Sequence, residues 1–206
     1  DGTGHQIFSC PAFAGDQDRS FGRGDLVIGS LAPSPVERGS ARPALETVVD
    51  VFAAAGVPVG RVGDADDFGA IVALNEREVQ QTSPMDLARL RELAQMSSHH
   101  KVAVVDGRIA AFLLAMREDA PYLNDNYAWF AARFPQFIYV DRIVVSSEFV
   151  GLKIGSQLYE DLFDYTRSQG IKAITCEYNV QPPNPASQRF HDRFGFKERG
   201  QQWVAH

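Results

Sequence analysis

Cysteine is scarce in this chain of 206 residues: Cys10 and Cys176 are its only two, far apart and without the spacing of metal ligands. We therefore expect neither a disulfide framework nor a structural zinc site. No apolar run approaches the roughly 18–20 residues that a membrane span needs. The first residues, DGTGHQ, lack the charged and apolar regions of a signal peptide. These absences predict a cytoplasmic protein that does not enter a membrane.

Positive charge is also in short supply. The chain has 20 Lys and Arg residues against 26 Asp and Glu residues, so its formal net charge is −6 and its isoelectric point is about 5.3. This balance argues against nucleic acid or an anionic membrane as a partner, and it suits a cationic substrate such as an amine. Hydrophobic residues make up 45% and charged residues 22%, which is typical of a soluble globular protein.

The first 56 residues differ from the rest of the chain. They are rich in Gly, Ser, Pro and Asp, with a short apolar segment at 26–31 that predicts a strand and a periodic segment at 43–55 that predicts a helix. We interpret residues 1–56 as an N-terminal strand–helix extension of a domain that covers residues 57–206. The extension either adds to the edge of the sheet or is exchanged between the subunits of a homodimer.

From residue 57 onward, apolar periodicity and turn signals alternate regularly. Asp106-Gly107 separates two apolar runs and is a strong hairpin signal. The predicted order is a strand at 57–62, a helix at 66–80, a helix from about Ser83, strands at 101–105, 109–116 and 137–145, a helix at 155–168, a strand at 171–178, a helix at 185–194 and a strand at 196–204. This order predicts an α/β fold with a mixed central sheet flanked by helices.

A glycine-bearing turn, VGLKIGS at 150–156, joins an apolar strand directly to an amphipathic helix. The start of a helix presents unpaired backbone N–H groups and the positive end of the helix dipole, so this turn is a candidate anion site. A second segment, NPASQRFHDRFGF at 184–196, predicts a helix that ends in Gly-Phe. Together the two segments indicate an enzyme that binds a phosphate-bearing acyl carrier and transfers the acyl group.

The order of elements, with DRIVVSSEFVGLKIGSQLYEDL at 141–162 and NPASQRFHDRFGF at 184–196, resembles the GNAT superfamily of acyl-CoA-dependent N-acetyltransferases. The resemblance covers roughly residues 57–204. The family's turn typically has Arg or Gln, two residues, Gly, one residue, then Gly or Ala. Aligned on Gly155, this chain has Val150 in place of Arg or Gln and Lys153 in place of the first Gly. Lys153 restricts the backbone more than glycine does, but it adds a cation beside a dianion.

The resemblance implies acetyl-CoA, or another acyl-CoA, as co-substrate and no metal. It also implies that the strand before the turn splays from its neighbour and holds the pantetheine arm by exposed backbone groups, while the turn holds the pyrophosphate. Asn184 would cap the last helix and contact the pantetheine. The full implied set is Ile143, Val144, Val145, Val150, Gly151, Leu152, Lys153, Ile154, Gly155, Ser156, Asn184 and Ser187.

Two carboxylates are candidates for the base or the anchor of the substrate amine. Asp141 lies in the strand before the turn, and period-two alternation places it on the side of Tyr139 and Ile143, with Arg142 on the other. Glu177 lies in the following strand and can line the cleft between the splayed strands. For each carboxylate the alternative is a structural role, in which backbone groups or a basic partner satisfy it.

His191 is the candidate acid. Many members of the family that this chain resembles carry a Tyr at the corresponding position, in a helix with the pattern Asn, two residues, Ala or Ser, two residues, apolar, Tyr. Asn184, Ser187 and Phe190 fit this pattern. A histidine can donate a proton near neutral pH, and the alternative is a partly exposed helix histidine without a catalytic role.

Aromatic residues gather in the connection at 121–137. In the family this region shapes the acceptor pocket, so we predict a substrate wall formed by Tyr122, Tyr127, Trp129, Phe130 and Tyr139. The alternative is core packing or a dimer contact. We expect the chain to be an N-acetyltransferase that moves an acetyl group from acetyl-CoA to a primary amine of a small molecule or peptide by direct attack. The rival hypothesis, favoured by Val150 and Lys153, is a non-catalytic acyl-CoA-binding or regulatory module.

Overall fold

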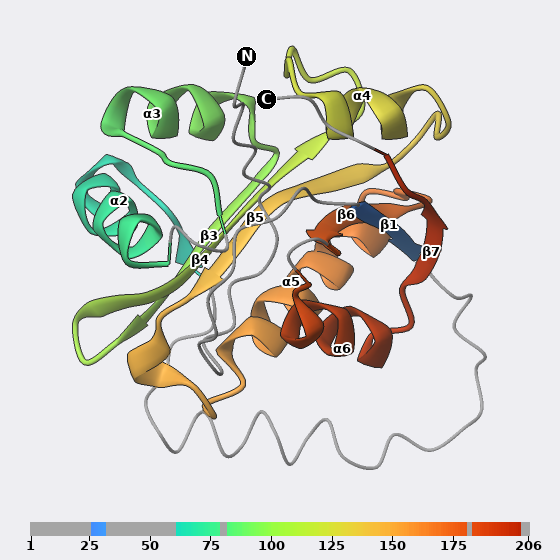
Figure 1. Cartoon of the computed structure of the whole chain (residues 1–206). Helices are drawn as coiled ribbons and strands as arrows, with labels where there is room; N and C mark the ends of the chain where they lie inside the picture. The colour runs from blue at the N-terminus through green and yellow to red at the C-terminus, as the bar shows by residue number, and fades with distance from the viewer. Residues whose placement is uncertain (1–25, 32–60, 79–81, 181–182, 203–206) are drawn as a thin grey trace, which may run out of the picture.

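The computed structural model describes residues 26–31, 61–78, 82–180 and 183–202. The helix predicted at 43–55 and most of the strand predicted at 57–62 lie outside these ranges. Within them, one sheet is flanked by helices on both faces, and this confirms the predicted α/β fold (Figure 1). No helix in the described ranges is both long enough and apolar enough to cross a membrane.

The sheet has seven strands in the order β2-β3-β4-β5-β6-β1-β7. Only β5 and β6 pair in parallel, whereas every other neighbouring pair is antiparallel, so the sheet is mixed as predicted. The strands are β1 Leu26–Leu31, β2 Arg61–Val62, β3 His99–Val105, β4 Arg108–Arg117, β5 Ile138–Val145, β6 Ile174–Asn179 and β7 Lys197–Gly200. The N-terminal strand β1 therefore does not end the sheet: it lies between β6 and β7.

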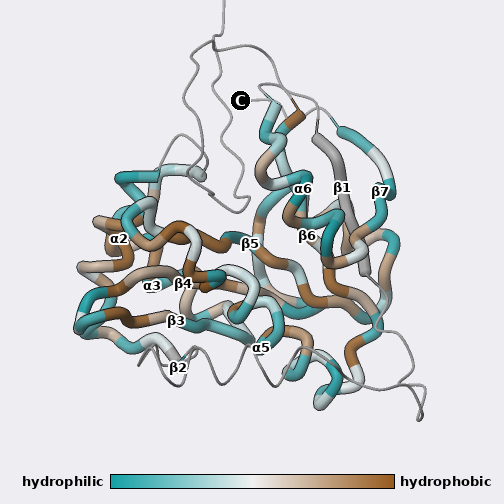
Figure 2. The backbone as a smooth tube through the Cα atoms, turned by 90° about the horizontal axis from the view of Figure 1, so that it is seen from below, coloured by the Kyte–Doolittle hydropathy of each residue, from teal (hydrophilic) through white to brown (hydrophobic). Residues whose placement is uncertain are grey.

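Within the described ranges, three α-helices cover one face of the sheet and two cover the other. The helical segments are η1 Ala65–Asp67, α2 Phe68–Arg77, α3 Leu87–Met96, α4 Asp125–Ala131, η2 Ser147–Phe149, α5 Ile154–Ser168 and α6 Pro185–Arg193. Buried residues of α2, α3 and α4 share one apolar cluster with the sheet, and those of α5 and α6 share the other. Figure 2 shows the most apolar chain in β4 and β5, at the centre between the two layers.

The start of α3 differs from the prediction. The helix begins at Leu87, and the Asp86 carboxylate accepts a hydrogen bond from the Arg89 N–H at 2.7 Å, so Asp86 is the N-cap. The predicted cap, Ser83, has another role, because its hydroxyl accepts a hydrogen bond from Arg142 at 2.9 Å. Ser83 and Asp86 are both suited to capping a helix. Because Ser83 binds the buried Arg142, Asp86 is left to cap α3.

A β-bulge in β5 changes which side chains share a face. Leu114 of β4 is opposite Arg142 and Ala115 is opposite Val140, so Asp141 is the extra residue. Tyr139 and Asp141 lie on the α2–α4 side, as predicted. Ile143 belongs instead to the cluster on the α5–α6 side, and Arg142 turns back to contact Asp141 at 2.8 Å. Uninterrupted period-two alternation was therefore the wrong assumption beyond Asp141.

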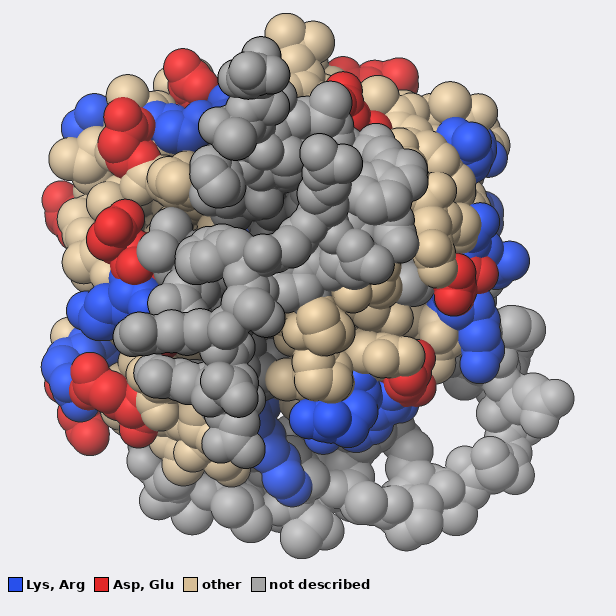
Figure 3. All heavy atoms as spheres, in the orientation of Figure 1, with Lys and Arg blue, Asp and Glu red and all other residues tan. Residues whose placement is uncertain are grey.

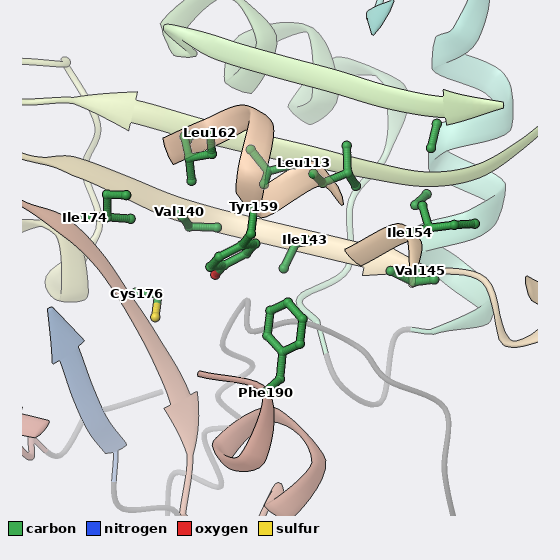
Figure 4. Packing of buried hydrophobic residues seen from close by; sticks show 14 of the residues in the cluster. Leu113, Val140, Ile143, Val145, Ile154, Tyr159, Leu162, Ile174, Cys176 and Phe190 are labelled. Atoms are coloured by element: carbon green, nitrogen blue, oxygen red, sulfur yellow. The ribbon is translucent and has the colours of Figure 1, made fainter. Parts of the chain in front are cut away.

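The α5–α6 side of the sheet is packed by large side chains from four elements. Figure 4 shows Tyr159 and Leu162 from α5 and Phe190 from α6 against Val140 and Ile143 of β5, with Ile174 and Cys176 of β6 alongside. Tyr159 and Phe190 meet edge to face, with ring centroids 5.0 Å apart. This packing fixes α5 and α6 beneath the junction of β5 and β6.

Candidate active site

The parallel strands β5 and β6 separate soon after they meet. Within the described residues, their only paired positions are Ile138 with Ile174 and Tyr139 with Thr175, so the last six residues of β5 have no strand partner on this side in that part of the chain. The predicted splay is therefore present. The Ser146 N–H donates to the Ala110 carbonyl of the β3–β4 hairpin at 2.8 Å, and backbone groups alternate in direction along a strand. The backbone groups of Ile143 and Val145 therefore point into the opening, whereas those of Val144 point to β4.

The glycine turn lies between the end of β5 and the start of α5. Gly151 has a φ of 93°, and Lys153, the N-cap of α5, has a left-handed backbone with φ 56° and ψ 21°. A lysine thus adopts the conformation that glycine adopts without steric cost. Such a conformation in a non-glycine residue is typical of functional sites. Behind it, the first N–H groups of α5 have no intrahelical acceptor.

Two cationic residues lie at this turn. The side chain of Lys153 is exposed, and Arg193 of α6 donates a hydrogen bond to the Ser156 hydroxyl at 3.0 Å. Figure 3 shows Lys and Arg side chains gathered beside α6 in the lower part of the view. Val150 and Leu152 are 55% and 38% exposed, so the turn offers apolar side chains as well as charge. The arrangement fits a phosphate with an organic substituent.

Glu177 lies on the other side of the opening, in β6, and is fully buried. Its Oε1 accepts hydrogen bonds from the Tyr139 hydroxyl at 2.6 Å and from the Asn126 amide at 3.1 Å. Its Oε2 is buried and has no hydrogen-bond partner among the described residues. Burial raises the pKa of Glu177 well above its ordinary value, and the hydrogen bond from Tyr139 only partly opposes this.

Asp141, the second candidate carboxylate, is also fully buried but is occupied by fixed donors. It accepts hydrogen bonds from the Tyr122 hydroxyl and from Arg142, whose Nε is 2.8 Å from Oδ2. Arg142 is anchored in turn by Asn75 of α2 and by Ser83. Asp141 therefore belongs to a buried ion pair that ties β5 to α2 and to the segment before α3.

His191 is 1% exposed beneath β6. Its Nδ1 lies 2.8 Å from the Ser187 carbonyl and its Nε2 lies 3.0 Å from the Tyr159 hydroxyl. A carbonyl only accepts, so Nδ1 carries the proton and Nε2 accepts from Tyr159. Burial lowers the pKa of His191 to about 4, with the Ser187 carbonyl opposing the shift. The imidazole is thus a neutral part of the core, flanked by the ring of Tyr178.

The last helix begins as predicted. The Asn184 side chain caps α6 by accepting a hydrogen bond from the Ser187 N–H at 3.0 Å. Ser187 itself is fully buried, and its hydroxyl lies 3.3 Å from His191 Nδ1. The Ser187 side chain therefore contributes to the packing around His191.

The predicted aromatic wall is largely core. Tyr122, Tyr127, Phe130 and Tyr139 are at most 6% exposed and belong to one apolar cluster, so core packing accounts for most of this set. Two of them also reach the carboxylates, because Tyr122 donates to Asp141 and Tyr139 donates to Glu177. Trp129 is partly exposed, and the guanidinium of Arg133 lies 3.6 Å from the centre of its ring.

Asn126 is the site residue that the sequence did not reveal. It is fully buried in α4, 51 residues before its partner Glu177. The one signal in the sequence is a polar amide next to the aromatic residues of this helix. Among the described residues, no group of three or more His, Cys, Asp and Glu side chains is arranged to hold a metal ion.

A diverging parallel strand pair, a turn suited to phosphate and a buried carboxyl between the strands define a domain of the acyltransferase class (EC 2.3.1). The family model described as "Acetyltransferase (GNAT) family" matches residues 66–196, more than half of the chain, and the chain therefore belongs to this family. No curated protein sequence matches the chain.

Solved structures of low identity share the fold. A protein assigned to the GNAT acetyltransferases from Novosphingobium aromaticivorans is 15% identical with a TM-score of 0.56, over 89% of this chain and 63% of its own. A GCN5-related N-acetyltransferase from Sphaerobacter thermophilus is 14% identical with a TM-score of 0.58, over 87% and 50%. An N-acetyltransferase from Staphylococcus aureus is 22% identical with a TM-score of 0.52, over 68% and 84%. The chain thus spans less than two thirds of the first two.

Proposed function

We propose that this domain transfers an acetyl group from acetyl-CoA to a primary amine of a small molecule or peptide. The observation that carries the proposal is the opening between β5 and β6, which has strand backbone without a partner among the described residues on one side and Glu177 on the other. Family membership supports the use of an acyl-CoA, because GNAT proteins generally use acetyl-CoA as co-substrate. The turn supports it independently, through its cations and its free N–H groups.

The residues of the opening suit the two halves of the carrier. Ile143 and Val145 offer backbone donors and acceptors to the amide groups of a pantetheine arm, much as a missing neighbouring strand would. The N–H groups of residues 154–156 and the ammonium of Lys153 suit the pyrophosphate. Val150, which replaces the family's Arg or Gln, contributes an apolar contact instead of a side-chain donor.

Glu177 suits the role of base better than Asp141 does. A base needs an oxygen that is free to accept a proton and a pKa near the operating pH. Glu177 has the unpartnered Oε2 and the raised pKa, whereas Asp141 is held by Arg142 and Tyr122. A buried carboxylate without a cationic partner also attracts an ammonium group, which matches the acidic balance of the chain. The acceptor is therefore an amine that arrives protonated.

The reaction then proceeds by direct transfer. Glu177 Oε2 takes a proton from the ammonium, and the neutral amine nitrogen attacks the thioester carbonyl carbon. The N–C bond forms and the C–S bond breaks, and the second proton of the attacking nitrogen passes to the thiolate. CoA therefore leaves as the free thiol, and Glu177 releases the first proton to solvent. His191 has both ring nitrogens in hydrogen bonds within the core, so we assign it to the packing of the core rather than to the role of acid.

Calorimetric titration with acetyl-CoA tests the carrier site. We expect micromolar binding that Lys153→Glu weakens at least tenfold, because reversed charge at the turn repels the pyrophosphate. Lys172→Glu is the matched control: it makes the same charge change at another exposed lysine and should leave binding unaltered. Absence of binding to the unaltered protein would contradict the proposal.

A screen of primary amines, with free thiol as the readout, tests the transfer. Glu177→Gln should lower kcat by about 100-fold or more, since general bases contribute on this scale. If acetyl-CoA binds but no amine in a broad panel is acetylated, the non-catalytic acyl-CoA-binding module becomes the better account.

A further inference from the structure

We propose that Asn126 of α4 is a positioning residue that fixes the Glu177 carboxyl so that Oε2 receives the proton. This inference rests on the proposed function, in which Glu177 is the base. It assigns a role in the reaction to α4, which packs against the start of β5 and contributes Asn126 from the face of the sheet opposite α5 (Figure 1).

The two donors to Glu177 in the described part of the chain approach the same oxygen. The Tyr139 hydroxyl, from β5, is 2.6 Å from Oε1, and the Asn126 amide, from α4, is 3.1 Å from it. Donors from two different elements fix the rotation of the carboxyl group, which a single donor leaves free to swing. Oε2 is left buried and without a partner in the described part of the chain. The network thus distinguishes two chemically equivalent oxygens and leaves one available.

The orientation of Asn126 is itself determined. Gln202, just after β7, donates its amide to Asn126 Oδ1 at 2.7 Å. A carboxylate only accepts hydrogen bonds, so Nδ2 must face Glu177 and Oδ1 must face Gln202. The helix is also packed closely on β7: a Cβ atom at Gly200 would lie 2.9 Å from the Trp129 ring. The contact between α4 and β7 therefore sets the distance from Asn126 to the carboxyl.

The hydrogen bond has an electrostatic consequence that core packing does not have. Burial raises the pKa of Glu177, and donation from Asn126 lowers it by stabilising the ionised form. Without Asn126 the base would stay protonated to higher pH. A purely structural amide would leave the titration of Glu177 unchanged.

The test is the pKa of Glu177 itself, measured by carbon-13 NMR on protein labelled at the glutamate carboxyl carbons. The signal that is absent from Glu177→Gln identifies the residue. In Asn126→Ala we expect this pKa to rise by about one unit. The apparent pKa of the acid limb in the pH profile of kcat/KM, measured with an amine that the screen yields, should rise by the same amount. At pH values below this pKa, kcat/KM should therefore be about tenfold lower than in the unaltered protein, and at higher pH it should recover.

Asn124→Ala is the matched control. Asn124 caps the same helix by accepting a hydrogen bond from the Tyr127 N–H at 3.0 Å, and it is not one of the two donors to Glu177. The Asn124→Ala substitution should lower the stability of the protein and leave the pKa of Glu177 unchanged. Gln202→Ala, at the end of the described chain, serves as a second variant if Asn126→Ala does not fold, and should raise the pKa by less. An unchanged pKa in Asn126→Ala or Gln202→Ala would overturn the inference and leave the proposed function intact. Full activity of Glu177→Gln would overturn the proposed function instead.

Discussion

Single residues carry the largest electrostatic costs in this protein. Glu177 is fully buried with a raised pKa, so the folded state holds its proton above the ordinary value of 4.5, at which the unfolded chain releases it. The folded state therefore binds more protons than the unfolded state above pH 4.5, and stability falls as pH rises toward the folded pKa. A group that costs stability at neutral pH while offering a free oxygen fits a functional residue better than a structural one.

Glu177→Gln should consequently be more stable than the unaltered protein at pH 8 and of similar stability at pH 4, because the amide has no proton to release. Urea unfolding of both proteins at pH 4, 6 and 8 measures this, because the difference between them isolates one titrating group. A stability difference that does not grow with pH would show that Glu177 does not retain its proton in the folded state.

His191 shows the opposite dependence on pH. Its pKa falls from 6.5 to about 4 on folding. Between these two pH values the imidazole is protonated in the unfolded chain and neutral in the folded state. The stabilising effect of the neutral ring is complete above pH 6.5 and is lost as pH falls to about 4, which amounts to roughly 3 kcal/mol. His191→Gln should reduce the loss of stability between pH 7 and pH 4 by this amount. Guanidinium unfolding of both proteins at pH 7 and pH 4 measures this difference. If the substitution leaves the pH dependence of stability unaltered, His191 is not a buried neutral imidazole in the folded state.

At the scale of elements, the turn before α5 stores backbone strain. Lys153 at φ 56° costs about 1 kcal/mol relative to glycine. Lys153→Gly should therefore stabilise the protein by about that amount and weaken acetyl-CoA binding through the loss of the cation. Lys153→Ala separates the two effects, because it removes the charge but keeps a Cβ atom at a positive φ. Thermal unfolding and calorimetric titration of the three proteins measure both. Equal stability of the Gly and Ala variants would mean that the turn is not left-handed.

Most elements and the location of the turn could be predicted from local sequence. Period-two and helical apolar patterns are strong in β4, β5 and α5, and the cap at Asn184 and the hairpin at Asp106-Gly107 are local signals. The bulge at Asp141 has no such signal, because it arises from pairing with β4. The donors of Glu177 were equally hidden, since Asn126 reaches it across 51 residues through the packing of α4. Local patterns thus predict the strands, helices and turn that surround the site, whereas the hydrogen bonds within the site depend on tertiary packing.

The sheet as a whole depends on its N-terminal strand. β1 is hydrogen-bonded on both sides, between β6 and β7, so it joins the two halves of the C-terminal part of the sheet. In the pairing register, Ile28 is opposite Glu177 on one side and Gly200 on the other. Residues 26–31 lie outside the part matched by the family model, yet they border the strand that carries the proposed base.

Ile28→Pro should therefore act on the active site from a distance in sequence. Proline removes a backbone N–H in a strand paired on both sides, which should cost about 2–3 kcal/mol. Ile28→Ala keeps the N–H and is the control for the loss of the side chain. Hydrogen exchange followed by mass spectrometry should show faster exchange in peptides that contain 174–179 and little change in 101–116. Acetyl transfer should fall together with the protection of β6, because Glu177 then loses its fixed position opposite Tyr139. If β6 exchanges at the same rate in both variants, β1 does not pair with it, and the active site is built without the N-terminal strand.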